Sequence, residues 1–332
     1  MDWACFAAAD GRIFLGEGPF EQRSEEPAAG VAFYRNDFAL SESKPWWVPA
    51  RVEEVTSLEA VFSQCNGRRE VEWEEIDAGR FAEVFREVTA AIGGGQLEKS
   101  VPVVTEQGRW QGPPSEWADF PGQLAKGMRL FGWGEAGAGV LSATPEQLFR
   151  LDRGLLETMA LAGTSRREDR ELFAVDEKEI REHEFVAQTL MAKLADFGMV
   201  RRKARQVMDL GQLIHFHTPI EVELYQNESP ERLVRRLHPT PALGPLPRTA
   251  ETLDWLLDWR QRLHCPRWFG APFGFWHDGV FEALVGIRMV LWEGEQVMVP
   301  SGCGVIEASR LVNEWRELRL KREAVRGLFR LG

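Results

Sequence analysis

Short apolar runs separated by polar and turn-forming residues dominate the pattern of this chain. In the first 75 residues, runs such as 12–15 and 31–34 lie between Gly, Pro and Glu clusters, which predicts strands and loops. Similar runs predict further strands at 97–104, 128–132, 138–142, 147–151, 201–225, 281–292 and 296–299. Pro102 makes the first of these irregular or an edge strand, and Pro300 is expected to end the last.

Apolar residues spaced three and four apart predict helices elsewhere. One helix is predicted to begin after a cap at Asp77 and to end at Gly93-Gly94-Gly95. Its apolar stripe consists of Phe81, Val84, Phe85, Val88 and Ile92. Further helices are predicted at 172–197, 230–237, 250–263 and about 309–329. Strands outnumber helices and do not alternate strictly with them, which predicts an α+β fold with large, mostly antiparallel sheets. No linker-like run is present, so residues 1–332 are predicted to form a single domain.

The net charge of the chain limits the kinds of molecule that it is expected to bind. The 332 residues carry a net charge of −11, which argues against nucleic acid or an anionic membrane as a partner. An anionic substrate therefore needs a locally positive pocket. The N-terminus lacks the pattern of a signal peptide, and no apolar stretch reaches transmembrane length. Four scattered cysteines without a CxxC motif give no zinc signature, so we expect a soluble, cytoplasmic protein.

Two acidic motifs are the strongest candidates for chemistry. Residues 179–182 and 314–317 both read Glu-x-x-Glu, which places two carboxylates on one face of a helix. Brought together, these carboxylates would suit a hard cation such as Mg²⁺. The chain has 51 acidic residues, so such pairs also arise by chance. The alternative is a solvated face on which Glu182 pairs with Lys178 and Glu314 pairs with Arg310.

Further motifs accompany the acidic pairs in a defined order. They are Gln96-Leu97-Glu98-Lys99, Thr144-Pro145-Glu146, Leu161-Ala162-Gly163-Thr164, Glu182-His183, Leu237-His238-Pro239-Thr240-Pro241-Ala242-Leu243-Gly244, Gly286-Ile287-Arg288, Gly302-Cys303-Gly304-Val305 and Glu314-Trp315-Arg316-Glu317. This set resembles the chorismate-utilising enzymes, which include isochorismate, salicylate, anthranilate and aminodeoxychorismate synthases. The resemblance runs from about residue 78 to the C-terminus, so 76–330 is taken as the family core and 1–75 as a variable N-terminal part.

The resemblance implies an α/β sandwich in which two antiparallel sheets are flanked by helices. It also implies the dianion chorismate as substrate and Mg²⁺ as cofactor. Glu182 and Glu317 match the direct metal ligands of the family, whereas Glu179 and Glu314 match residues that hold the waters of the metal.

Two residues match the catalytic acid and base. Lys99 corresponds to the lysine that activates a water to attack C2 of chorismate, and Glu146 corresponds to the acid that protonates the departing C4 hydroxyl. To act as an acid, Glu146 needs a raised pKa, which burial would supply. The alternatives are an exposed lysine at a strand end and an exposed loop glutamate.

The remaining matches concern substrate binding. Arg288, within an apolar predicted strand, and Lys321 correspond to contacts with substrate carboxylates. By resemblance, Gly302 and Gly304 allow the backbone to approach an anion closely, and Gly163 and Thr164 form a tight turn near the ring. Leu243, Phe269 and His215 are assigned by resemblance to the walls of the pocket. For His215, a structural histidine is the alternative.

Three positions distinguish the branches of the family. Lys99 stands where amine-forming members usually have Gln, which points to water as the nucleophile. Ala162 replaces the lysine of covalent aminodeoxychorismate synthases, and Leu243 stands where pyruvate-eliminating members have Thr. The resemblance therefore implies a Mg²⁺-dependent isochorismate synthase, an isomerase, with no obligate glutaminase subunit and a monomeric state.

Other readings stay open. The chain could be a salicylate synthase or a non-catalytic chorismate-binding protein, whereas no P-loop supports a phosphotransferase. Pro102, Val104 and Cys303 depart from the family pattern, and the N-terminal part is short. Whether the product enters menaquinone or siderophore biosynthesis is not decided by the sequence.

Overall fold

Antiparallel strands make up most of the molecule, which is known here from a computed structural model that describes residues 2–55, 70–111, 124–211 and 213–332. The strands are β1 (Trp3–Ala7), β2 (Ile13–Arg23), β3 (Val31–Arg35), β4 (Trp46–Val55), β5 (Val71–Trp73), β6 (Val103–Trp110), β7 (Arg129–Glu135), β8 (Ala138–Thr144), β9 (Gln147–Asp152), β10 (Leu155–Arg166), β11 (Gly198–Arg202), β12 (Gln206–Asp209), β13 (Leu213–Leu224), β14 (Pro272–His277), β15 (Val280–Val285), β16 (Met289–Glu293) and β17 (Gln296–Gly302). The helices are α2 (Ala78–Gly93), α3 (Arg170–Phe173), α4 (Glu177–Leu194), α5 (Pro230–Leu237), α6 (Ala250–Arg262) and α7 (Leu311–Leu328).

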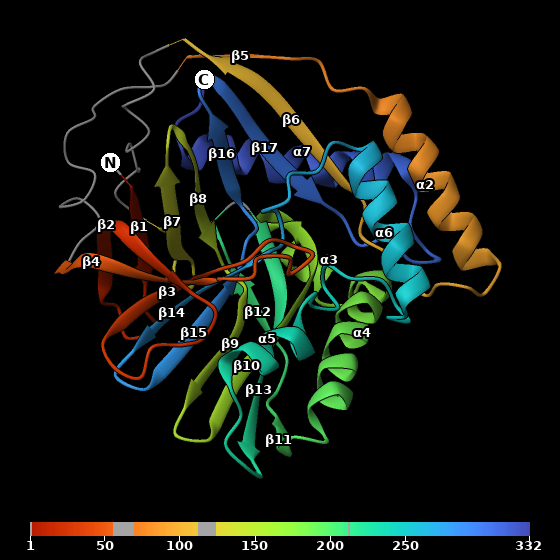
Figure 1. Cartoon of the computed structure of the whole chain (residues 1–332). Helices are drawn as coiled ribbons and strands as arrows, with labels where there is room; N and C mark the ends of the chain where they lie inside the picture. The colour runs from red at the N-terminus through yellow and green to blue at the C-terminus, as the bar shows by residue number, and fades with distance from the viewer. Residues whose placement is uncertain (1, 56–69, 112–123, 212) are drawn as a thin grey trace.

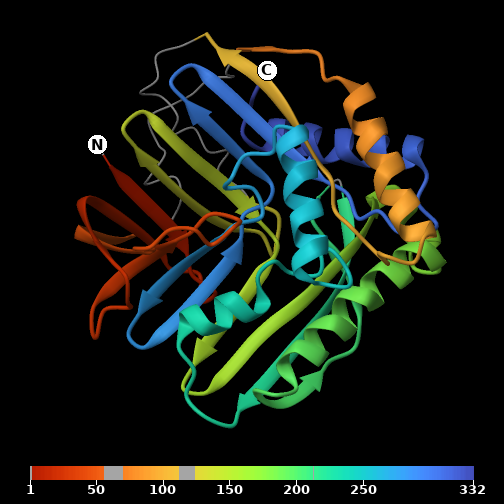
Figure 2. The same cartoon turned by 45° about the vertical axis from the view of Figure 1, so that its right-hand side comes forward.

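Hydrogen bonds join the described strands into one 17-stranded network. The N-terminal strands belong to it, because β1 pairs with β7 and β3 pairs with β14. In Figures 1 and 2, α2, α4 and α6 lie on the side of the molecule opposite β1–β4. Helix α4 packs against β10 and β13, and α7 packs against β17. The predicted α+β fold with a large antiparallel sheet is confirmed.

Side-chain burial explains these contacts. In α2, Asp77 caps the helix by accepting a hydrogen bond from the backbone N–H of Gly79, as predicted. Four of the five residues in its predicted apolar stripe are buried, whereas Ile92 is partly exposed. The helix faces α6 and α7 across a cluster that contains Trp259 and Leu318. No helix among the described residues has the length and apolarity needed to span a lipid bilayer.

Several predicted boundaries were wrong. The strand predicted at 97–104 begins only at Val103, and Lys99 and Ser100 form isolated bridges instead. The helix predicted at 172–197 is interrupted, because Asp176 caps the start of α4 and separates it from α3. The strand predicted at 281–292 breaks after Val285, so Arg288 lies between β15 and β16 with a positive φ of 51°.

Pro300 does not end its strand, contrary to the prediction. Strand β17 continues through it to Gly302, and Pro300 pairs with Thr105 of β6. The neighbouring strand β16 pairs with β17 only as far as Met298. From there on β17 has one hydrogen-bonded neighbour strand, and an edge position tolerates a proline. Strands β10 and β14 were not predicted as strands at all.

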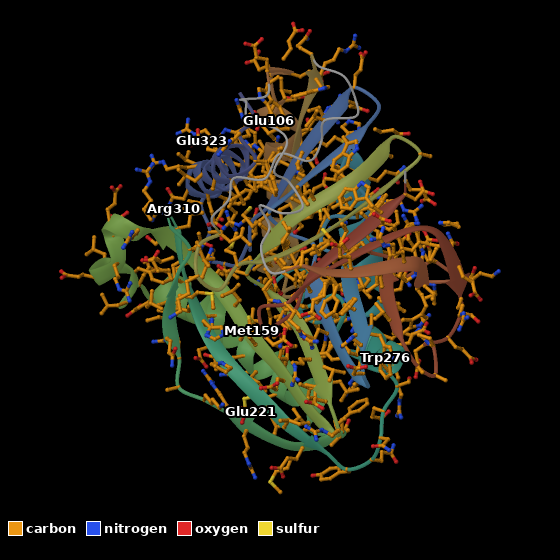
Figure 3. The ribbon with its side chains drawn as sticks, turned by 90° about the vertical axis from the view of Figure 1, so that its left-hand side faces the viewer. Glu106, Met159, Glu221, Trp276, Arg310 and Glu323 are labelled. Atoms are coloured by element: carbon orange, nitrogen blue, oxygen red, sulfur yellow. The ribbon has the colours of Figure 1, made fainter. Side chains whose placement is uncertain are left out.

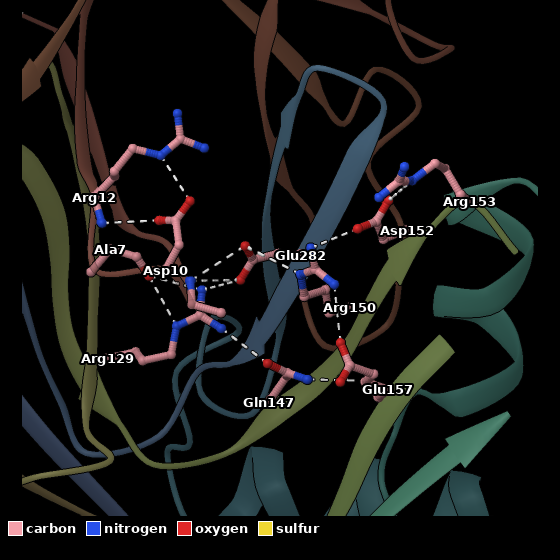
Figure 4. A network of polar contacts seen from close by, with 11 residues as sticks. Ala7, Asp10, Arg12, Arg129, Gln147, Arg150, Asp152, Arg153, Glu157 and Glu282 are labelled. Atoms are coloured by element: carbon pink, nitrogen blue, oxygen red, sulfur yellow. Dashed lines mark hydrogen bonds and ion pairs between the residues drawn. The ribbon is translucent and has the colours of Figure 1, made fainter. Parts of the chain in front are cut away.

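A buried charge network ties the N-terminal strands to the rest of the sheet (Figure 4). Glu282 of β15 accepts hydrogen bonds from the backbone N–H of Ala9 and from Arg129 of β7. Arg129 also donates to the carbonyl of Ala7 and to Gln147. The side chain of Glu282 is 8% exposed and that of Arg129 is 15% exposed. Elsewhere, Glu106 of β6 forms ion pairs with Arg322 and Arg326 of α7. Figure 3 labels Glu106 and also Glu323 of α7.

We expect Glu282→Ala to lower the free energy of unfolding by about 3–5 kcal/mol, because it leaves the buried Arg129 without its carboxylate. Urea unfolding followed by circular dichroism measures this. Glu323→Ala is the control, since its pair with Arg319 is on the surface and should contribute less than about 1 kcal/mol. Equal losses in the two variants would contradict the role of the buried network.

Candidate functional site

A cavity of about 680 Å³, including its open mouth, lies where β10, β13 and β17 meet α7 and the start of α4. Most of the residues assigned from the sequence line it together. They are Glu146, Gly163, Thr164, Glu182, His215, Leu243, Phe269, Arg288, Gly302, Gly304 and Lys321. The remaining four lie outside the lining. Lys99, Glu179 and Glu317 each contact a lining residue, and Glu314 contacts Lys178.

The two acidic motifs converge, with Lys178 between them. The Lys178 ammonium lies 2.8 Å from Glu179 Oε1, 3.4 Å from Glu314 Oε1 and 3.7 Å from Glu182 Oε2. Carboxylates from α4 and α7 therefore surround one cation. The alternative pairing of Glu182 with Lys178 is thus present, but in a buried cluster and not on a solvated face. No ion pair between Glu314 and Arg310 is found among the described residues.

The charges in this cluster act on one another. Burial, followed by repulsion from Glu182, raises the pKa of Glu179 to about 7. Burial and repulsion from Glu317 raise the pKa of Glu314 to about 7 in the same way. For Glu182, burial is the largest influence and raises the pKa, but the nearby ammonium groups outweigh it and lower the pKa overall. Glu317 contacts Lys321 Nζ at 2.5 Å.

The carboxylate oxygens of this cluster are the type of ligand that a hard cation such as Mg²⁺ prefers. These oxygens already surround a positive charge. In the parts of the chain that the structure describes, however, no three acidic, His or Cys side chains are close enough to ligate a metal directly. The carboxylates are arranged around an ammonium group, whose contacts are longer than metal bonds.

Lys99 and Glu146 are both buried at this cavity. Lys99 is fully buried, and its Nζ lies 3.3 Å from Glu182 Oε1. Glu146, in the turn between β8 and β9, accepts a 2.8 Å hydrogen bond from Thr240. Burial raises the pKa of Glu146 to about 7, against the lowering effects of Thr240 and the lysines. Neither residue is the exposed side chain that formed the alternative interpretation.

A histidine connects the turn after β10 with Arg288. His215 Nδ1 lies 2.9 Å from the carbonyl of Gly163, which can only accept, so Nδ1 carries the proton. Nε2 is then the acceptor for Arg288 Nη2 at 3.1 Å. Burial and the positive charge of Arg288 hold the pKa of His215 well below its usual value, so the ring is neutral. His215 therefore orients the guanidinium.

Arg288 is a cation without an anionic partner. The structure corrects its predicted place in a strand, because it lies in a bend with positive φ. Among the described residues it forms no ion pair within 4 Å, and burial lowers its pKa to about 10, which keeps it charged at neutral pH. Arg288 is half-buried and lines the cavity, and an unpaired guanidinium in such a place is costly, which favours an anionic ligand there. Lys321, by contrast, is already paired with Glu317.

Two glycines permit the close approaches of the site. Gly163 has a φ of +76° and sits at a bulge in the β10–β13 pairing, where the N–H of Thr164 reaches Glu179 Oε2 at 2.7 Å. A Cβ on Gly304 would lie 2.0 Å from Glu182 Oε1 and 3.0 Å from Lys99 Cε. A side chain at position 304 would therefore displace the Glu182 carboxylate from its present contact with Lys99.

Sequence reasoning missed two contributors. Thr240 lies within a quoted motif, but its hydrogen bond to Glu146 was not predicted. Lys178 was considered only as a surface partner of Glu182, although its position directly before Glu179 in the sequence is a usable signal. Ser301 and Val325 also line the cavity.

Comparison with known proteins agrees with this geometry. A family model described as "Chorismate binding enzyme" matches residues 42–329. The chain belongs to this family. The match begins upstream of residue 78, where the recognisable motifs start, so it includes part of the N-terminal strands.

Individual relatives carry related names. The chain is 30% identical to the salicylate biosynthesis isochorismate synthase of Pseudomonas aeruginosa over 93% of its own length and 59% of that protein. It is 30% identical to isochorismate synthase MenF of Bacillus subtilis over 58% of the chain and 42% of that protein. It is 32% identical to EntC of Escherichia coli over 59% of the chain and 52% of that protein. The chain thus spans about half the length of these relatives.

Solved structures share the fold. The menaquinone-specific isochorismate synthase MenF from Escherichia coli aligns with a TM-score of 0.82 at 19% identity, covering 99% of this chain and 89% of that one. A putative 2,3-dihydroxybenzoate-specific isochorismate synthase, DhbC from Bacillus anthracis, aligns with a TM-score of 0.81 at 18% identity, covering 100% and 96%. The N-terminal strands therefore belong to the shared fold as well.

We expect Gly304→Ala to lower the free energy of unfolding by about 1–3 kcal/mol, because the added methyl overlaps Glu182. Urea unfolding measures the loss. Gly327→Ala on α7 is the matched control, since nothing lies within 4 Å of its added Cβ and it should be neutral or stabilising. A Gly304→Ala variant as stable as the wild type would show that the site has room that the structure does not show.

Proposed function

We propose that this chain is a Mg²⁺-dependent isochorismate synthase that converts chorismate to isochorismate. The observation that carries the proposal is that the buried carboxyl of Glu146 lines one cavity together with Glu182, and that the buried Lys99 contacts Glu182 from outside the lining. The names of the three relatives described above point the same way.

The substrate is a dianion, and the cavity offers it positive charge. Arg288 is unpaired within the described residues and is oriented by His215, so it suits a substrate carboxylate. Gly302 and Gly304 line the cavity, and the lack of a side chain at these positions lets a ligand approach the backbone. Phe269 and Leu243 supply apolar wall on the same cavity. Together these groups hold the ring between the base and the acid.

The chemistry exchanges one water for another. Lys99, paired as an ammonium with Glu182, first gives up one proton to solvent. The neutral amine then takes a proton from a water whose oxygen bonds to C2, while the electron pairs shift through the ring and the C4–O bond breaks. Glu146 gives its proton to the departing hydroxyl, which leaves as water. A carboxyl with a pKa of about 7 is about half protonated at pH 7, so a substantial fraction of the enzyme carries the proton that this role requires.

The metal would sit at the carboxylate cluster. Glu182 and Glu317 would bind it directly, and Glu179 and Glu314 would hold its waters. When bound, Mg²⁺ would neutralise the ring carboxylate of the substrate. The support is the convergence of carboxylates from α4 and α7 around one positive charge.

The proposal extends to the sheet arrangement, the oligomeric state and the location of the protein. We propose that the sheet network works as two sheets flanking the cavity, that the protein acts as a monomer without a glutaminase subunit, and that it is cytoplasmic. Relatives named as isochorismate synthases support a single-chain enzyme. Whether the product feeds menaquinone or siderophore synthesis is a matter for genomic context.

Incubation with chorismate and Mg²⁺, followed by chromatography, tests the function. We expect isochorismate as the product, and we expect Lys99→Ala to lose at least about 100-fold in rate while chorismate still binds, because the water then lacks its base. Lys193→Ala, on the same helix as Glu182 but outside the cavity, is the control. Salicylate with pyruvate would instead identify a salicylate synthase, and binding without turnover would identify a chorismate-binding protein.

The protonation of Glu146 has its own test. Its pKa is raised from an ordinary value of 4.5 to about 7, so the folded state holds the proton more tightly than the unfolded chain. The associated stability is fully present below about pH 4.5 and is lost as pH rises to about 7. Glu146→Gln lacks this loss, so its stability relative to wild type should rise by about 3 kcal/mol across that window.

Urea unfolding of both proteins at several pH values measures this difference. Glu157→Gln, at a more exposed carboxylate on β10, is the control and should show no comparable trend. A stability difference between Glu146→Gln and wild type that does not change with pH would refute the buried, protonated carboxyl.

A further inference from the structure

The ammonium of Lys178 lies among the carboxylates assigned to the metal. It contacts Glu179, Glu182 and Glu314 at 2.8, 3.7 and 3.4 Å, so it reaches both helices that carry the acidic motifs. Its side chain is 21% exposed, which leaves a path to solvent. No other lysine or arginine within the described residues pairs with either Glu179 or Glu314.

Electrostatics explains why a cation lies there. Glu179, Glu182 and Glu314 are each at most 8% exposed, and several carboxylates brought this close repel one another. Lys99 pairs with Glu182 and Lys321 pairs with Glu317, which leaves Glu179 and Glu314 to Lys178. One oxygen of Glu314 is buried and still lacks a hydrogen-bond partner. The cluster therefore has capacity for more positive charge than it holds.

The position of Lys178 in its helix is unfavourable on its own. It is the second residue of α4, which begins at Glu177 after the Asp176 cap. The positive end of the helix dipole disfavours a cation in this first turn. The ammonium is held there by the carboxylates. A cation of higher charge that binds the same oxygens would therefore release it.

A metal and this ammonium cannot share the site as it stands. Mg²⁺ needs oxygens at about 2.0–2.1 Å, whereas the ammonium nitrogen now lies between the same oxygens at 2.8–3.7 Å. Drawing those oxygens onto a divalent ion would also place two positive centres in direct repulsion.

We propose that Lys178 is a built-in competitor of the divalent cation: it neutralises the glutamate cluster in the metal-free protein and leaves the cluster when the metal binds. The inference rests on the proposed metal site and adds a step to it. Metal binding is then an exchange of one internal cation for one external cation. The cost of displacing Lys178 weakens the affinity, while its presence stabilises the metal-free state.

Calorimetric titration of Mg²⁺ into the chorismate-free protein tests the exchange. Lys178→Met removes the competitor, so its Mg²⁺ dissociation constant should fall on the order of tenfold, and the variant should melt at a lower temperature than wild type in EDTA. Lys178→Arg keeps the charge and should bind Mg²⁺ about as weakly as wild type. Lys193→Met, near the other end of α4 and without a carboxylate partner among the described residues, should leave the dissociation constant unchanged.

A second measurement uses only the wild-type protein. Reductive methylation of the wild type, read by mass spectrometry of the peptide that contains Lys178, should be faster in Mg²⁺ than in EDTA, whereas Lys193 should react equally in both. Weaker or unchanged Mg²⁺ binding by Lys178→Met, or no gain in labelling, overturns the proposal.

The outcomes also separate this inference from the proposed function. Both measurements omit chorismate, so an inactive protein that still passes them would refute the catalytic proposal alone. A wild type that binds no Mg²⁺ would overturn the metal site and the exchange together.

Discussion

The site depends on the burial of acidic side chains against a matching set of ammonium groups. Lys99 and Lys178 both contact Glu182, and Lys321 contacts Glu317. The pair of Lys178 with Glu314 joins α4 to α7. Buried charges are stable only when they are paired. The convergence of two segments more than a hundred residues apart is therefore as much an electrostatic requirement as a packing result.

The sheet supplies the geometry for this cluster. The long pairing of β10 with β13 places Thr164 opposite His215, and the bulge at Gly163 turns the backbone toward Glu179. Helix α4 packs on the same two strands, so the glutamates of its first turns are fixed relative to the histidine. The far side of the fold, held by Glu282 and Arg129, keeps the N-terminal strands in register with the rest.

Much of this was predictable from the sequence, for identifiable reasons. The α2 stripe and its Asp77 cap are local patterns, and they were predicted correctly. The motifs of the site are compact, so their residues could be assigned individually. The break before Arg288 and the passage of β17 through Pro300 depend on which neighbours pair with those strands, and such tertiary information is absent from local patterns. Lys178 was undervalued because a lysine beside a glutamate is usually a surface pair.

Gly304 has a consequence for comparing sequences. A single methyl at this position would occupy the space of a carboxylate oxygen, so the present contact between the lysine and the glutamate behind it depends on glycine. The position can therefore serve as a marker when uncharacterised chains of this kind are classified. In a chain that carries a larger residue there, the glutamate carboxylate would have to take another position relative to the lysine.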